Sequence, residues 1–226
     1  MEKTIKIGFY NHKGGCGKTT SVINVAYVLQ KLGKKILVVD CDSQMNCFSF
    51  FQSGKDRMAF QPSKYARIYN TTWNAYTTAS DKAKELAFDY IIFDLPPALT
   101  DEVKEIIRHC DSVFVPIILG YFEISGLADV TAEIQKQGAR LGGVFASMFN
   151  PANNDGEAIS ELRSILKNRL LDTVIPWSKT VRESQKAELA IEDYFKQINV
   201  PPNPQSWKTV HAYEELANEI IERSAI

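Results

Sequence analysis

The segment GFYNHKGGCGKTT, residues 8–20, combines glycines with a lysine and adjacent threonine hydroxyls. Glycines let the backbone curl so that successive amides point at one anion, without a Cβ in the way. Lys18 supplies a positive charge beside them, and the Thr19 hydroxyl suits a Mg²⁺ ligand. The pattern predicts a loop that binds the β- and γ-phosphates of a nucleotide. The alternative is a glycine-rich turn with a solvated lysine.

Carboxylates that could serve this loop follow two apolar runs. Asp40 ends KILVVD and Asp42 lies two residues after it, while Asp94 ends YIIFD. An acid at the end of a buried parallel strand lies at the sheet edge where ligands of open α/β folds gather. We therefore expect these acids to lie near the loop. The simpler interpretations are that Asp40 caps a turn and that Asp94 is a buried structural acid.

Short β-rich apolar runs alternate with helical patterns. The predicted strands are 4–10, 35–40, 90–94, 112–119, 143–148 and 173–175. Helical spacing of apolar residues predicts helices that end near Gly33, begin after Thr100 and Asp101, end at Gly138, and begin after 154–156. A last helix is expected over 206–223, after an extended 201–204 linker.

Nearly continuous apolar strands that alternate with helices are typical of one architecture: an α/β fold with a doubly wound, mostly parallel sheet and helices on both faces. The length of 226 residues suits one domain over 1–226. Residues 49–79 have weaker periodicity, so we expect an irregular excursion there with one short helix. The helix at 206–223 is expected to dock on the core.

Composition excludes several classes of protein. The net charge of −1 gives no global attraction to polyanions, so any nucleic-acid binding needs a local patch. No apolar run approaches a membrane span, and the first residues lack the apolar core of a signal peptide. The four cysteines form no CxxC pair, which favours a cytoplasmic protein without a metal cluster.

The loop and the carboxylates together resemble the ParA/MinD class of P-loop ATPases, which carry a deviant Walker A motif, and small Soj-type members most of all. The resemblance rests on KGGCGKT, with Lys13 before the glycines, on DCDSQ after the second strand, and on DLPP from Asp94. Ser43 stands where the class has proline, and Met45 where glycine is frequent. Val115-Pro116 and Gly126-Leu127 are similar to a further strand–helix unit of the class.

The resemblance implies ATP and Mg²⁺ as ligands, a homodimer in the ATP state, and weak hydrolysis that a partner stimulates. The implied nucleotide contacts are Lys13, Gly14, Gly15, Cys16, Gly17, Lys18, Thr19, Thr20, Asn150 and Pro176. The implied metal-site residues are Thr19, Asp40 and Asp94. Lys13, Lys18 and Asp42 are the implied catalytic residues, with Lys13 reaching the partner's nucleotide and Asp42 orienting water. Lys13 could instead face solvent, and Asn150 could belong to a turn.

Three functions within the class stay open. A ParA-type partition ATPase would bind DNA non-specifically, associate with the nucleoid and work with a ParB-like or small centromere-binding protein. The predicted DNA contacts are Lys167, Lys179, Arg182 and Lys186, accompanied by Arg163 and Arg169, although an ordinary solvated surface has similar composition. A MinD-like membrane ATPase would need a basic amphipathic terminal helix, whereas this one is rich in glutamate. A metallocluster carrier would need paired cysteines.

Overall fold

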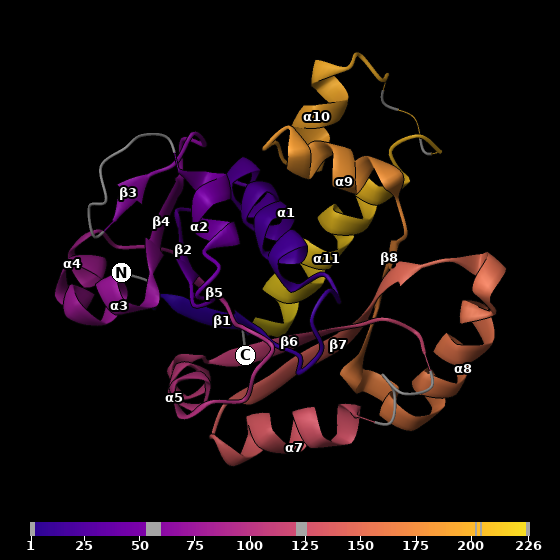
Figure 1. Cartoon of the computed structure of the whole chain (residues 1–226), viewed down its shortest axis with the longest axis horizontal. Coiled ribbons are helices and arrows are strands. Elements are labelled where there is room, and N and C mark those ends of the chain that lie inside the picture. Colours follow the sequence, from indigo (N-terminus) through magenta and orange to yellow (C-terminus); the bar gives the residue numbers. More distant parts are fainter. Residues whose placement is uncertain (1–2, 53–59, 121–125, 202, 204, 225–226) are drawn as a thin grey trace.

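One eight-stranded sheet forms the centre of the computed structural model, which describes residues 3–52, 60–120, 126–201, 203 and 205–224 (Figure 1). The strands are β1 (Ile5–Phe9), β2 (Ile36–Asp40), β3 (Gln61–Pro62), β4 (Ile68–Thr72), β5 (Tyr90–Asp94), β6 (Ser112–Ile117), β7 (Arg140–Phe149) and β8 (Leu170–Pro176). Their order is β3-β4-β2-β5-β1-β6-β7-β8. Each neighbouring pair is parallel except β3 and β4. The predicted doubly wound, mostly parallel fold is confirmed.

Helices cover both faces of the sheet, because its inner strands are apolar on both sides (Figure 1). The helices are α1 (Lys18–Lys31), α2 (Asn46–Phe51), α3 (Trp73–Thr78), α4 (Ser80–Glu85), α5 (Asp101–His109), α7 (Leu127–Lys136), α8 (Asp155–Leu166), α9 (Lys179–Lys186), α10 (Ile191–Gln197) and α11 (Lys208–Ser224). One apolar core joins α1, α2, α10 and α11 to the sheet, and a second joins α3, α4, α5, α7 and α8 to the other face.

The terminal helix α11 crosses the face that α1 also covers. Its apolar side chains are buried: Val210, Tyr213, Leu216, Ala217 and Ile220. The Asn203 carboxamide oxygen accepts from the amides of Gln205 and Ser206 just before the helix. Of the predicted extended linker, residues 202 and 204 lie outside the described residues.

The prediction of an irregular excursion over 49–79 is wrong for much of that segment. It contains β3, β4 and α3, with residues 53–59 outside the described part. The strand β4 reads IYNTT, and its Asn70 and Thr71 are fully buried beside β2. Because polar residues fill a buried strand here, hydrophobic periodicity does not reveal it. The helices α9 and α10 were not predicted either.

Candidate functional site

The glycine-rich loop joins the end of β1 to the first turn of α1, as its pattern predicts. Gly15 and Gly17 have φ of +76° and +92°, a region that L side chains rarely adopt. A Cβ on Gly15 would meet nothing within 4 Å, so the backbone there borders open space rather than a packed neighbour. This conformation leaves the loop amides and the first amides of α1 available to an anion.

The ammonium group of Lys18 holds this loop together from inside. The side chain is buried, and Nζ donates to the backbone oxygens of Asn11 (3.2 Å) and Lys13 (3.0 Å). The Asn11 carboxamide spans the base of the loop, since Nδ2 donates to the Pro116 oxygen (2.7 Å) and Oδ1 accepts from the Lys13 amide (3.1 Å). Phosphate oxygens would replace weak carbonyl partners of Lys18 with charged ones.

A residue far along the chain also supports the loop. Ser147 in β7 is buried, and its hydroxyl donates to the Cys16 backbone oxygen at 2.7 Å, with the Ile117 oxygen at 3.3 Å. Sequence reasoning missed Ser147, because a lone serine in an apolar strand carries no motif.

Asp94 lies beside the first turn of α1. Parallel register pairs it with Phe9 on one side and Asp40 on the other, so the three strand ends meet at one edge. Asp94 is 2% exposed and accepts a hydrogen bond from the Thr19 hydroxyl. Its Oδ1 has no hydrogen-bond partner among the described residues. Burial raises the pKa of Asp94 to about 7; the Thr19 hydroxyl opposes that rise and the charge of Asp40 adds to it.

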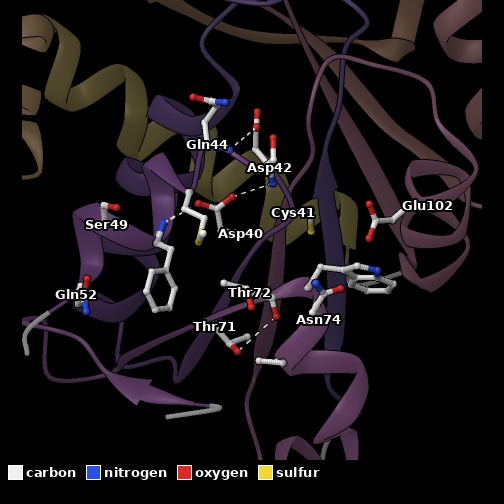
Figure 2. Close-up of a pocket in the computed structure, with 15 residues that line it drawn as sticks. Asp40, Cys41, Asp42, Gln44, Ser49, Gln52, Thr71, Thr72, Asn74 and Glu102 are labelled. Carbon is white, nitrogen blue, oxygen red and sulfur yellow. Dashed lines mark hydrogen bonds between the residues drawn. The ribbon is translucent and has the colours of Figure 1, made fainter. Parts of the chain in front are cut away.

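Asp40 shapes the loop that follows β2. Its buried carboxylate accepts from the amides of Asp42 (2.9 Å; Figure 2) and Phe48 (2.8 Å). Burial raises the pKa of Asp40, and these two amides lower it. The half-buried Asp42 carboxylate accepts from the Gln44 amide at 3.0 Å. Asp40 therefore fixes the loop on which Asp42 is carried.

A cavity of about 710 Å³ opens next to these two acids, between α2 and α3 (Figure 2). Glu102 at the start of α5 lines it as well, and Trp73 forms part of its wall. Among its described lining residues the ionisable carboxylates are Asp40, Asp42 and Glu102, and none of those residues is basic. The cavity thus borders the carboxylate side of the site.

A second, smaller pocket of about 120 Å³ borders the loop at Gly17. It is lined by Gly17 and Thr20, by the ends of β7 and β8 including Pro176, and by α9. Asn150 is not among the residues that line it. Its carboxamide oxygen accepts instead from the Ala152 amide (3.2 Å), so the structure gives Asn150 a local turn contact.

Comparisons with known proteins agree with this geometry. The family described as the CobQ/CobB/MinD/ParA nucleotide binding domain matches residues 7–191. The chain belongs to this family.

Its relatives within the family extend over nearly the whole chain. It is 25% identical to the chromosome-partitioning ATPase Soj of Thermus thermophilus, over 98% of this chain and 97% of the relative. In fold it matches the cell division ATPase MinD of Pyrococcus furiosus (TM-score 0.77, 21% identity, covering 97% and 99%). It also matches MinD of Pyrococcus horikoshii, complexed with Mg-ADP (TM-score 0.74, 19% identity, covering 96% of each). The chain is thus a ParA/MinD-type P-loop protein.

The predicted DNA contacts of this ParA/MinD-type chain fall into two groups. Lys179, Arg182 and Lys186 lie on α9 at i, i+3 and i+7 spacing, and all three are exposed. Lys167 and Arg169 belong to the 3-10 helix η2 (Lys167–Arg169), at the opposite end of β8.

Several of these basic residues have other contacts. Arg163 pairs with Asp172 at 2.6 Å and Lys179 with Glu183 at 3.4 Å, while Arg182 lines the smaller pocket. Because η2 and α9 lie at opposite ends of β8, Lys167 does not share a surface with the basic residues of α9. Lys179, Arg182 and Lys186 are exposed together on α9.

Residues of the site fit a Mg²⁺ ion that arrives with a nucleotide. The buried Asp94 offers a carboxylate oxygen that has no partner among the described residues, next to the Thr19 hydroxyl. Mg²⁺ keeps waters and takes few protein ligands when it is bound with phosphates. In the described residues, no three His, Cys, Asp or Glu side chains form a group that could hold a metal by themselves. No helix in the described chain is long and apolar enough to span a membrane.

Proposed function

We propose that this chain is a ParA-type ATPase. In this proposal it binds Mg-ATP and forms a dimer with the nucleotides at the interface. The dimer then binds DNA non-specifically and uses hydrolysis to partition a plasmid, chromosome or other cargo. The family membership and the likeness to the partitioning ATPase Soj support this function.

The proposal rests on the closeness of the phosphate loop and the carboxylates at one edge of the sheet. The loop with Lys18 at its centre lies at the same sheet edge as the Thr19–Asp94 pair, and Asp42 follows the neighbouring strand. Phosphoryl transfer requires little from a protein besides positioning and charge stabilisation. This edge offers donors for phosphates, a hydroxyl and a carboxylate for the metal shell, and a second carboxylate for water.

Each residue then has a distinct role. Lys18 contacts the β- and γ-phosphates, and Thr19 with Asp94 holds Mg²⁺, with Asp40 supporting it through water. Bound Mg²⁺ supplies charge neutralisation on the phosphates. Asp42 orients the attacking water. The exposed Lys13 reaches the nucleotide of the second protomer.

Two observations favour partition over a MinD-like membrane ATPase. The apolar side of α11 is buried in the protein's own core, which leaves no free amphipathic face on the described part of that helix. The basic residues Lys179, Arg182 and Lys186 lie on one exposed face of α9, which suits contacts to phosphates. Lysines that meet phosphates carry no base information, so the expected DNA binding has little sequence preference.

The test measures ATP hydrolysis and retention of random-sequence duplex DNA, with ATP and with ADP, for the wild type and Lys18→Ala. We expect slow hydrolysis and ATP-dependent retention by the wild type, and neither by the variant. Circular dichroism checks the fold, because Lys18 is buried and bonds two loop carbonyls. A folded Lys18→Ala variant with wild-type ATP affinity would remove the phosphate-loop assignment. Hydrolysis without ATP-dependent DNA retention would support the ATPase activity but contradict the proposed DNA binding.

A further inference from the structure

A third pocket, of about 380 Å³, lies away from the phosphate loop. It is bordered by the amino ends of β1 and β5, by α3 and α4, and by the last residues of α5. The phosphate loop and Asp94 follow the carboxyl ends of the same two parallel strands. The pocket is therefore separated from the candidate functional site by the length of β1, and none of the residues assigned to that site lines it.

Lys6 occupies a position in this pocket that is unusual for a charged residue. It belongs to β1, an inner strand of the sheet, whose alternate residues pack into the core beside α1: Ile5, Ile7 and Phe9. Because side chains alternate along a strand, Lys6 faces the opposite side, which α3, α4 and α5 cover. Ile91 on β5 is in register with Lys6 and belongs to the core of that side. A lysine side chain thus lies on the helix-covered face of an inner strand.

The charge of Lys6 has no partner among the described residues. Its side chain is half-buried, and its ammonium group makes no ion pair or hydrogen bond with them. The neighbouring Asp111 pairs instead with Lys3 at 2.9 Å and accepts from the Lys6 backbone amide at 2.8 Å. Charged groups that folding draws away from water normally gain a counter-charge. The unpaired ammonium group therefore favours an anion in this pocket.

Tyr76 supplies a second polar group to the lining. It is 5% exposed, and its hydroxyl forms no hydrogen bond with a described residue. Burial raises the pKa of this hydroxyl, so it stays protonated and able to donate. A buried donor without an acceptor is costly, and an anionic group in the pocket would supply an acceptor.

The other charged groups of the lining leave Lys6 as the one that can bind a ligand's charge. Lys84 is exposed and already pairs with Asp81 at 2.8 Å. Glu105, the one acid among the described lining residues, is exposed to solvent, where water screens its charge.

We propose that this pocket binds a small organic anion, with its negative group on Lys6 and its apolar body against Tyr76, Ala83 and Ile91. These last three residues are buried, and they line the pocket with an aromatic ring and aliphatic groups. A volume of about 380 Å³ is in the range of small-molecule sites. Carboxylates and phosphate esters share this chemistry. The proposal does not rest on the proposed function.

The experiment uses Trp73 as the reporter, because its ring contacts those of the lining residues Tyr76 (5.8 Å between centroids) and His109 (5.2 Å). Fluorescence titrations use the full chain carrying Trp177→Phe, which removes the exposed indole and leaves Trp73 and the buried Trp207. Phenylacetate and phenyl phosphate should change the emission at about millimolar concentration. Benzyl alcohol, which lacks the charge, and inorganic phosphate, which lacks the ring, should bind roughly tenfold more weakly or less.

Variants in the same background locate the response. Lys6→Met keeps the aliphatic stem without the charge, and should weaken the binding of both organic anions roughly tenfold or more. Lys6→Arg should restore it. The control Lys3→Met removes a nearby charge that does not line the pocket, and should have no effect. Lys18→Ala should also leave the titrations unchanged, because the phosphate loop lies at the other end of β1.

The outcomes are distinct. A response to only one of the two organic anions, lost in Lys6→Met, supports the site and identifies the acidic group that it takes. No response to either anion, or a response that persists in Lys6→Met, overturns the site. Benzyl alcohol or inorganic phosphate that binds as tightly as the organic anions overturns it as well. A response lost in Lys18→Ala would assign the anions to the phosphate loop instead. None of these results alters the proposed function, which the hydrolysis and DNA-retention assays test separately.

Discussion

Asp94 is a carboxylate that the fold buries with one oxygen unbonded among the described residues. A buried acid without full hydrogen bonding favours its protonated form, and burial raises its pKa to about 7. The folded state then binds more protons than the unfolded state between about pH 4 and pH 7. The nucleotide-free protein therefore loses stability as pH rises through this range, because the unfolded chain ionises more easily.

We expect the wild type without nucleotide and Mg²⁺ to have a free energy of unfolding about 2–3 kcal/mol lower at pH 8 than at pH 5 from this group. Asp94→Asn should remove that difference, since the amide does not ionise. Urea unfolding at the two pH values measures it. Asp129→Asn, on the exposed side of α7, is the control and should keep the wild-type dependence. An unchanged pH dependence in Asp94→Asn would contradict this account of the carboxyl.

Residue types of the phosphate loop and its carboxylates could be predicted from the sequence because they lie in contiguous motifs. The loop pattern predicts Lys18 and Thr19, and the end of an apolar strand predicts Asp94. Ser147 could not be predicted, because its contact with the Cys16 oxygen arises only where β7 passes the loop. Contacts between segments more than a hundred residues apart depend on strand order, which local patterns do not encode.

The helix α9 lines the smaller pocket and also carries basic side chains on the protein surface. The Gln185 side-chain amide donates to the Thr20 hydroxyl, and Lys179 and Lys186 are exposed to solvent. Arg182 lines the smaller pocket beside Gly17 and Thr20, so its replacement would change the surroundings of the phosphate loop as well as the proposed DNA contact. Lys179 and Lys186 are the sharper probes of DNA contact.

We expect Lys179→Glu with Lys186→Glu to weaken ATP-dependent retention on random-sequence duplex DNA by roughly tenfold or more. It should also reduce the log–log salt slope by about 2–4 for a dimer, at ~0.9 for each phosphate that the protein no longer neutralises. Filter retention across a salt series measures both. Lys167→Glu with Arg169→Glu makes the same change in charge at the far end of β8, and should have little effect. If the η2 variant is the one that fails to retain DNA, the DNA-binding surface lies there instead of on α9.

Strands made of apolar residues were predictable from the sequence, whereas a strand that buries polar residues was not. The predicted runs at 35–40 and 90–94 became β2 and β5, whose residues are all buried. Thr100 caps α5 as expected, since its hydroxyl accepts from the Val103 amide. The strand β4 was not predicted because it buries the polar Asn70. The Asn70 carboxamide donates to the Phe48 oxygen in α2, and this contact cannot be read from the local sequence.

At the scale of the whole molecule, dimerisation and hydrolysis should be separable. Lys13→Ala should bind ATP but stay monomeric by light scattering, because the proposed Lys13 contact is to the other protomer's nucleotide. Asp42→Ala should accumulate an ATP dimer, with hydrolysis reduced by about 100-fold or more, the scale of losing a water-positioning group. Lys34→Ala, which changes a lysine in the turn after α1, is the control for the removal of a positive charge. An ATP dimer in Lys13→Ala, or normal hydrolysis in Asp42→Ala, would contradict the assigned roles.

All four cysteines of the chain are buried, and burial raises the pKa of each thiol: Cys16, Cys41, Cys47 and Cys110. The thiolate is the form that attacks alkylating reagents, so the native protein should resist them. Alkylation then proceeds through transient opening, and its rate measures how often each region opens. Cys16 follows the carboxyl end of β1, whereas Cys110 precedes the amino end of β6, the parallel strand beside it. The alkylation rates of these native cysteines therefore report local opening at both ends of the sheet, and no label has to be introduced.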